Sequence, residues 1–229
     1  TWGKPCFVAW TTTPWTLPSN VALCVGPKIE YVVVETYNPY DAEKLTLVMA
    51  ASRVAAYLKS EGEITDGGEL PEYERGDKYV PYRIVGRVMG TELEGMHYQQ
   101  LMPWVKPVEQ TGDFAPKFVN DYAAAHPEKV FASEDGRDKF VEMESEAFRI
   151  ILGDYVTTDD GTGIVHIAPT FGADDAKVAK DANIPALYLI SKKGQTRPMV
   201  DLQGKYYTIE ELDQNFVKAC VNEKAYSHH

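Results

Sequence analysis

Two groups of polar side chains in this sequence are of types that could carry out chemistry. The first is a threonine run at 11–13, which follows the apolar stretch "CFVA" and precedes a proline. Threonine is stiff at χ1, so it can form a rigid pocket wall and still offer a hydroxyl to a bound molecule. The second group is His166 with Asp174 and Asp175. Imidazole and carboxylate are among the groups that most often hold or transfer protons in catalysis.

A strand and a helix must position the second group. His166 lies in the apolar segment "GIVHIA" (163–168), which predicts a strand buried on both faces. Asp174 and Asp175 fall in the first turn of a helix predicted over 173–183, where the helix dipole favours carboxylates. Successive helical residues differ by about 100° around the axis, so only one of the two aspartates can face a given cavity.

The threonine run needs a bend if its hydroxyls are to share one site. A regular strand predicted over 6–12 would point Thr11 and Thr13 to one face and Thr12 to the other. A bend before Pro14 would bring all three together, and the restricted backbone of a residue before proline favours one. No Ser/His/Asp arrangement is apparent in the sequence, and a threonine hydroxyl without a strong base is a poor nucleophile.

Each of these features also has an ordinary structural explanation. A lone histidine in an apolar strand is usually a hydrogen-bonded core residue, and first-turn aspartates are usually helix caps. The turn Gly161-Thr162-Gly163 has the composition of any tight hairpin. Taken one at a time, the features therefore favour structure over function.

Two other classes of function remain open on the residues alone. A metal-dependent phosphoesterase could use His166, Asp174 and Asp175, but it would need further ligands nearby. A non-catalytic barrel that binds single-stranded RNA could use Trp10 and Trp15 as stacking platforms. The remaining histidines show no recognisable ligand spacing: His97, His126, His228 and His229.

Charge limits these possibilities. The chain has 229 residues and a formal net charge of −11, and Lys192 and Lys193 are its only adjacent cations. Phosphate neutralisation dominates affinity for nucleic acids, so any nucleic-acid substrate must be held mainly by something outside these residues. The sequence has neither a GxGxxG motif nor a P-loop, which argues against a nucleotide-hydrolysing site.

Cysteine usage and the apolar runs indicate the compartment. Cys6, Cys24 and Cys220 are scattered and odd in number, which favours a reducing compartment and argues against a disulfide framework or a structural zinc site. No apolar run approaches the length of a membrane span, and the start shows no signal-peptide pattern. We therefore expect a cytoplasmic protein with no membrane partner.

Strands dominate the predicted secondary structure. β-Branched runs between turn residues predict strands over 6–12, 21–25, 30–36, 44–50, 82–89, 147–156, 163–168 and 186–191. Helical patterns predict helices over 52–61, 173–183 and 208–226, with a short helix around 117–125. The order lacks regular βαβ alternation, so we expect one α+β domain over 1–229, with a mixed, barrel-like sheet and a few peripheral helices. The terminal 227–229 is either native sequence or the start of a purification tag.

Two stretches acquire a sharper interpretation when they are taken together. "WTTTPWTLPSN" (10–20) followed by "GTGIVHIAPTFGADD" (161–175) closely resembles the editing insertion, connective peptide 1, of isoleucyl-tRNA synthetases. The sister enzymes for valine and leucine carry arginine where Thr13 stands, so this threonine indicates the isoleucine branch. "GMHYQQLMPW" (95–104) is similar to a short motif of these domains, whereas Phe171 departs from relatives with histidine there. Because the nucleotide-binding signatures of a synthetase body are absent, the chain resembles an excised domain.

The resemblance implies an editing hydrolase. Its substrate would be valine wrongly esterified to isoleucine tRNA, with valyl-adenylate as a further candidate. This family is itself the standard example of double-sieve editing, in which one methylene is worth only about 1–3 kcal/mol and a second site removes what the first admits. The implied partners are the acceptor end of isoleucine tRNA carrying valine and the remainder of the synthetase, the isolated domain being a monomer. The alternatives are the editing domain of a valyl- or leucyl-tRNA synthetase and the RNA-binding barrel.

By the same resemblance, His166, Asp175, Thr12 and Thr13 are the candidate catalytic residues. Asp175 would pair with the free α-ammonium group of the aminoacyl ester, and His166 would shape the acyl pocket and position substrate or water. Water would attack the ester directly, without a metal or another cofactor for editing, although the parent enzyme would use ATP and Mg. The candidate substrate-binding residues include these and four more: Thr11, Trp15, Gly161 and Thr162.

Overall fold

The computed structural model describes residues 2–226, which divide into two compact units. Of the described chain, unit 1 comprises 2–11, 23–95 and 150–165, and unit 2 comprises 12–22, 96–149 and 166–226. The assignment of 1–229 to a single domain stays a prediction. Residues 227–229, which are either native sequence or the start of a purification tag, lie outside the described residues.

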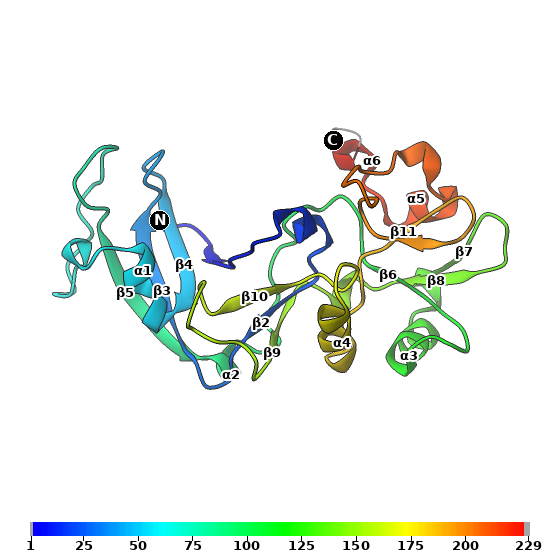
Figure 1. Ribbon diagram of the computed structural model, residues 1–229, viewed down its shortest axis with the longest axis horizontal. Helices are drawn as coiled ribbons and strands as arrows, with labels where there is room; N and C mark the ends of the chain where they lie inside the picture. The colour runs from blue at the N-terminus through cyan, green and yellow to red at the C-terminus, as the bar shows by residue number, and fades with distance from the viewer. Residues whose placement is uncertain (1, 227–229) are drawn as a thin grey trace. The chain divides into compact units, whose positions relative to one another are not determined.

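Unit 1 is built on a mixed four-stranded sheet of order β1-β4-β3-β5 (Figure 1). Its strands are β1 (Pro5–Phe7), β3 (Glu30–Tyr37), β4 (Lys44–Ala50) and β5 (Tyr82–Met89). β1 pairs parallel with β4, whereas β3 pairs antiparallel with β4 and with β5. The short helices of this unit are α1 (Val54–Tyr57) and α2 (Gly90–Leu93). One core cluster of this unit consists of Val32, Val34, Met49, Val54 and Tyr82.

Three further strands have residues in both units. They are β2 (Ala22–Val25), β9 (Arg149–Leu152) and β10 (Ile164–Ile167), and they form a sheet of order β10-β2-β9. β2 is buried along its whole length, as expected for a short continuous apolar run.

Unit 2 combines an antiparallel sheet of order β6-β8-β7 with a two-stranded pair and several short helices. The strands are β6 (Val108–Gln110), β7 (Val130–Ala132), β8 (Lys139–Glu142), β11 (Leu189–Ile190) and β12 (Thr196–Arg197). The helices are α3 (Lys117–Ala125), α4 (Ala173–Asp181), α5 (Gln214–Cys220) and α6 (Glu223–Tyr226). α3 buries Val119 against Val141 and Met143.

The continuous helix predicted over 208–226 is wrong. Thr208 caps only a 3₁₀ turn, and the chain then restarts as α5 behind Asp213. The carboxylate of Asp213 is fully buried and accepts hydrogen bonds from the backbone N–H of Phe216 and of Glu134. A residue at the N-cap of a helix has a non-helical backbone conformation. Asp213 has the extended conformation of an N-cap, so it interrupts the predicted helix.

Other predicted elements are shorter than expected for local reasons. The strand predicted over 6–12 pairs with β4 only from Pro5 to Phe7, and the strand over 147–156 becomes regular only after Phe148, whose φ is +55°. The helix predicted over 52–61 is divided into α1 and the 3₁₀ turns Ala51–Arg53 and Ser60–Gly62, because Leu58 is extended and packs against the core of unit 1.

The predicted α+β class with a mixed sheet and peripheral helices is confirmed. The strands of residues 2–226 are divided among four sheets, and no closed barrel forms among them. No helix in this part of the chain is both long and apolar enough to cross a membrane.

Candidate functional site

Both ring nitrogens of His166, on the unit 2 side of β10, make hydrogen bonds. Nε2 lies 2.9 Å from Oγ1 of Thr16, and Nδ1 lies 3.3 Å from Nδ2 of Asn20. Thr16 and Asn20 belong to the threonine-rich segment at 10–20. The stretches 10–20 and 161–175 therefore contact each other through His166, which is 150 residues from Thr16 in the sequence.

The partners of His166 determine its tautomer. An amide NH₂ group can only donate, so Nδ2 of Asn20 donates to Nδ1 of the imidazole and also to the carbonyl of Ala22. Nδ1 is then the acceptor, and Nε2 carries the proton and donates to Oγ1 of Thr16. Thr16 donates its own proton to the carbonyl of Thr13 at 2.8 Å. The chain of donors and acceptors is consistent at every step.

Tyr98 fixes the orientation of the Asn20 amide. Its hydroxyl donates to Oδ1 of Asn20 at 2.6 Å, so the oxygen and nitrogen of this amide cannot exchange places without losing that bond. The Tyr98 ring packs edge-on against Phe148, with centroids 6.1 Å apart. Burial raises the pKa of Tyr98 well above its usual value, which keeps the hydroxyl protonated as a donor.

Burial also decides the charge of His166. It lowers the pKa of the imidazole, and the nearby negative charge of Asp175 opposes this effect only in part. The imidazole is therefore neutral at physiological pH. With one nitrogen accepting and the other donating, it has no spare lone pair to act as a base in this arrangement.

A tight turn brings Thr16 to the histidine. The backbone bends at Thr12, and Pro14 begins a 3₁₀ helix over Pro14–Ser19, where its fixed φ suits the first helical position. The N–H of Thr16 bonds to the carbonyl of Thr13 at 3.0 Å and closes the turn. Thr16 is consequently buried, whereas the neighbouring Trp15 is 59% exposed. The bend expected before the proline is confirmed.

The helix that follows β10 separates the two aspartates. Oδ2 of Asp175 accepts a hydrogen bond of 2.8 Å from the backbone N–H of Ala168, immediately after the strand that carries His166. Asp174, one position earlier in α4, is exposed. The side chains thus occupy different faces of the helix, as the 100° geometry requires, and Asp175 is the one beside the imidazole.

The remaining candidate residues fall in both units. Thr12 is exposed and Thr13 is half-buried in unit 2, whereas Thr11, Gly161 and Thr162 belong to unit 1. Within unit 1 the carbonyl of Gly161 accepts a bond from the Arg53 guanidinium at 2.7 Å, and that of Thr162 accepts one from the Ala50 N–H at 2.9 Å. Gly161 has a φ of +63°, a conformation that glycine adopts without strain.

Three residues of the network were not predicted as site residues from the sequence. Thr16 and Asn20 lie inside the quoted 10–20 stretch, and Tyr98 lies in "GMHYQQLMPW", but nothing in their spacing predicts that they converge on His166. Within residues 2–226, no three His, Cys, Asp or Glu side chains cluster closely enough to hold a metal ion.

Loss of the Tyr98 hydroxyl should change the protonation of His166. In Tyr98→Phe the Asn20 amide can rotate and turn its oxygen toward Nδ1, which favours a proton there. We therefore expect the pKa of His166 to rise and the Nδ1 signal to move toward the protonated form, at a stability cost of about 1 kcal/mol. The measurement is ¹⁵N NMR of the imidazole across a pH titration.

The exposed Tyr40, which is 78% accessible, supplies the control for this experiment. Tyr40→Phe should leave the His166 titration unchanged. Protonated Nδ1 in the unmodified protein at pH 7 would contradict the tautomer assigned here.

Comparisons with known proteins place the chain by sequence. No protein-family model matches it. The isoleucine–tRNA ligase of Bacteroides thetaiotaomicron is 53% identical over 225 residues, which is 98% of this chain and 17% of that protein. The ligase of Porphyromonas gingivalis is 45% identical over 94% of this chain and 16% of its own length. That of Thermoplasma acidophilum is 32% identical over 87% of this chain and 14% of its own length.

Solved structures show a weaker likeness. The P. knowlesi cytosolic leucyl-tRNA synthetase editing domain aligns with a TM-score of 0.43 and 14% identity over 78% of this chain and 50% of that one. GlLeuRS-CP1 aligns with a TM-score of 0.38 and 16% identity over 78% and 45%. The sequence relatives match nearly all of this chain, which spans 17% of the length of the first of them. By its sequence the chain belongs to the isoleucine–tRNA ligase family.

Proposed function

We propose that this chain hydrolyses the ester bond of valyl-tRNA formed on isoleucine tRNA, and valyl-adenylate as a further substrate, while it rejects isoleucine by size. One observation carries the proposal: the hydrogen bond of 2.9 Å between Thr16 and His166. It joins the two stretches that resemble the editing insertion. Family membership supports the same conclusion, since the chain is 53% identical to an isoleucine–tRNA ligase over 98% of its length.

Asp175 is proposed to bind the α-ammonium group of the substrate. That cation distinguishes an aminoacyl ester from an ordinary ester, so a selective site needs a negative charge to bind it. Asp175 uses Oδ2 for the N–H of Ala168. An ionised carboxylate offers about four acceptor positions, which leaves capacity on Oδ1 for the ammonium. Bonds between charged partners are about twice as strong as neutral ones.

The reaction itself is proposed to be direct attack by water. An aminoacyl ester is already activated, and holding a water beside it can supply about 7–11 kcal/mol through proximity and orientation. The hydroxyls of Thr12 and Thr13 would position the water and the ester. Because both nitrogens of His166 are occupied, its role is to hold Thr16, and through it the Thr13 carbonyl, in place. Thr11, Trp15, Gly161 and Thr162 are proposed to contact other parts of the substrate.

The partners and the compartment follow from the same proposal. The acceptor end of isoleucine tRNA would enter the site, and the rest of the synthetase would supply most of the tRNA affinity, because this chain carries a net charge of −11. The parent enzyme would use ATP and Mg for its synthetic reaction, and editing would need no cofactor. We place the protein in the cytoplasm and expect the separate domain to be a monomer.

Enlarging the acyl pocket should weaken the size filter. Thr13→Ala removes a hydroxyl and a methyl group from a half-buried position, so isoleucyl-tRNA should become a substrate in the whole synthetase that contains this segment. We expect its deacylation to rise by about 10-fold or more, since a methylene-sized difference is worth about 1–3 kcal/mol. The measurement is the release of amino acid from preformed isoleucyl-tRNA.

Thr65→Ala is the matched control, because Thr65 is exposed and lies outside the candidate site. It should leave the rates for both esters unchanged. Unchanged rates for both esters in Thr13→Ala would show that Thr13 does not form the filter, and the same comparison with Trp15→Ala tests the second proposed wall.

A further inference from the structure

Phe148 has a backbone conformation that a bulky residue rarely adopts. Its φ is +55°, in the left-handed region, where the Cβ of an L-residue crowds the following carbonyl oxygen. Glycine adopts this conformation without that cost, yet the chain has a buried phenylalanine here. Backbone strain of this kind persists only where surrounding contacts hold it, and it is common at functional sites. The contacts of Phe148 therefore identify what holds the residue in this conformation.

The backbone of Phe148 bonds to two separate segments of unit 2. Its N–H donates to the carbonyl of Val21 at 2.7 Å, and its carbonyl accepts the N–H of Tyr98 at 2.8 Å. A hydrogen-bonded residue in a regular antiparallel ladder exchanges both bonds with the one residue opposite it. Phe148 instead divides its two bonds between Val21 and Tyr98. Its left-handed backbone is the local departure from strand geometry that goes with this division.

These two bonds hold both ends of the hydrogen bond between Tyr98 and Asn20. Asn20 directly precedes Val21 in the chain, and Oδ1 of Asn20 accepts the Tyr98 hydroxyl proton at 2.6 Å. Phe148 therefore fixes the backbone of the donor and the backbone next to the acceptor. The Phe148 ring also packs edge-on against the Tyr98 ring, with planes at 80°. One residue thus holds Tyr98 both at its backbone and at its ring.

The same backbone bonds extend to the strand that carries His166. The N–H of Val21 donates to the carbonyl of Ile167 at 3.0 Å, and Ile167 follows His166 in β10. Val21 is therefore bonded to Phe148 on one side and to the strand of His166 on the other. Asn20 lies next to Val21, and its Nδ2 lies 3.3 Å from Nδ1 of His166. The position of the Asn20 amide relative to the imidazole therefore depends on Phe148.

We propose that Phe148 is a positioning residue for the His166 network. It holds the Tyr98 hydroxyl against Asn20, and the Asn20 amide then presents its NH₂ group to Nδ1 of His166. The imidazole proton is thereby kept on Nε2, where it is donated to Thr16. Any effect on catalysis rests on the editing function proposed above, whereas the tautomer of His166 can be measured without a substrate.

The first test is the tautomer of His166 in this chain, measured from the two ¹⁵N signals of the imidazole at neutral pH. Phe148→Leu keeps a buried apolar side chain but removes the ring that packs against Tyr98. We expect the fraction of imidazole protonated on Nδ1 to rise by about 2- to 10-fold, the change expected when one hydrogen bond that biases the tautomer is weakened. The matched control is Phe140→Leu, which removes a fully buried ring stacked on Phe131 in the same unit and should leave the tautomer unchanged.

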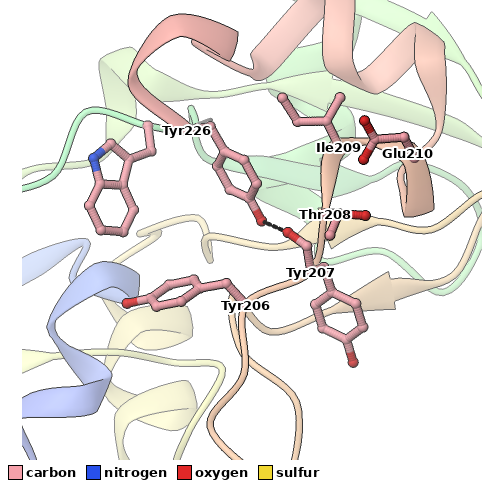
Figure 2. Close-up of a pocket in the computed structure, with 7 residues that line it drawn as sticks. Tyr206, Tyr207, Thr208, Ile209, Glu210 and Tyr226 are labelled. Atoms are coloured by element: carbon pink, nitrogen blue, oxygen red, sulfur yellow. Dashed lines mark hydrogen bonds between the residues drawn. The ribbon is translucent and has the colours of Figure 1, made fainter. Parts of the chain in front are cut away.

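A double variant tests whether Phe148 acts through the Tyr98 hydroxyl. Tyr98→Phe already lacks that hydroxyl, so the addition of Phe148→Leu should change the tautomer no further. Figure 2 shows the control residue, Tyr226, a second buried tyrosine of unit 2 whose hydroxyl donates to the carbonyl of Tyr207 at 2.6 Å. The cavity that Tyr226 lines shares no residue with the His166 network. In a Tyr226→Phe background, Phe148→Leu should therefore have its full effect.

Two small substitutions test the backbone strain. Phe148→Ala and Phe148→Gly both remove the ring, but only glycine adopts the left-handed conformation without a steric cost. We expect Phe148→Gly to melt about 2–4 °C above Phe148→Ala, and both to show the same change of tautomer. Ala42→Gly, in unit 1 with a φ of +59°, should raise the melting temperature and leave the tautomer unchanged. A Phe148→Gly variant that melts at or below Phe148→Ala would overturn the strain.

Three results would overturn the positioning role. They are an unchanged tautomer in Phe148→Leu, an equal change in Phe140→Leu, and additive effects of Phe148→Leu and Tyr98→Phe. In the whole isoleucine–tRNA ligase that contains this segment, Phe148→Leu should lower kcat for the deacylation of valyl-tRNA by about 2- to 10-fold and change KM less. An unchanged kcat beside a changed tautomer would overturn the role in catalysis. A parent ligase that leaves valyl-tRNA intact would overturn the proposed function alone, because the tautomer is measured without it.

Discussion

Asp175→Ala should strongly reduce the hydrolysis of valyl-tRNA by the whole synthetase, whereas Asp174→Ala should retain most of it. The proposed reason is that Asp175 binds the substrate ammonium, and loss of one partner of a close charge pair costs about 2–5 kcal/mol. That cost corresponds to a rate loss of about 30- to 5,000-fold. Asp174 is exposed on another face of α4, where it interacts favourably with the helix dipole, worth about 0.3–1 kcal/mol of stability, and with the charge of Lys177. The measurement is the deacylation rate of preformed valyl-tRNA.

A third variant separates charge from structure at this position. Asp175 also accepts the Ala168 N–H, so its alanine variant should lose about 1–2 kcal/mol of stability for a structural reason. Asp175→Asn keeps an oxygen for the Ala168 N–H and removes only the negative charge. We expect Asp175→Asn to melt close to the parent and to deacylate as poorly as Asp175→Ala. Full activity in Asp175→Asn, or equal losses in the two alanine variants, would mean that the ammonium is bound elsewhere.

Glu109→Gln should stabilise the protein at alkaline pH by up to about 3 kcal/mol. Burial raises the pKa of Glu109 from 4.5 to about 7, and the hydrogen bond from the Ala186 N–H opposes this only in part. A raised folded-state pKa contributes stability that is fully present below about pH 4.5 and is lost as the pH rises through about 7. The glutamine amide stays neutral, and its oxygen can still accept the Ala186 N–H, so this loss should disappear.

Denaturant unfolding at pH 8 and at pH 4.5 measures the effect. The gain should be largest at pH 8 and close to zero at pH 4.5. Glu69→Gln, at an exposed position, should stay within about 0.5 kcal/mol of the parent at both pH values. A gain in Glu109→Gln of equal size at both pH values would contradict a raised pKa as its cause.

The sequence pattern predicted correctly those helices and strands whose ends are determined by neighbouring residues. The helix predicted around 117–125 is α3, which follows Pro116, and the strand predicted over 82–89 is β5. The break in the helix predicted over 208–226 depends on a contact from elsewhere, because the capping carboxylate of Asp213 also accepts the N–H of Glu134. A sequence window around Asp213 contains no sign of that partner.

In the candidate site, too, some features could be predicted from local sequence and others depend on distant contacts. Helix geometry in the sequence already required one of Asp174 and Asp175 to face away, and the structure places Asp175 beside the imidazole. The anchoring of His166 could not be predicted, because Tyr98 and Asn20 are 78 residues apart and meet only in the folded chain. The roles of Thr12, Thr13 and the other candidate residues in hydrolysis stay predictions.

The most direct test of the editing proposal is the deacylation of two preformed substrates by the whole isoleucine–tRNA ligase that contains this segment. Valyl-tRNA and isoleucyl-tRNA, both made on isoleucine tRNA, are mixed with excess enzyme without ATP or free amino acid, and ester loss is followed over time. We expect the valyl ester to be hydrolysed at least about 100-fold faster than the isoleucyl ester, and deletion of the segment to remove this difference. Equal rates for the two esters, or an unchanged preference after the deletion, would contradict the editing proposal.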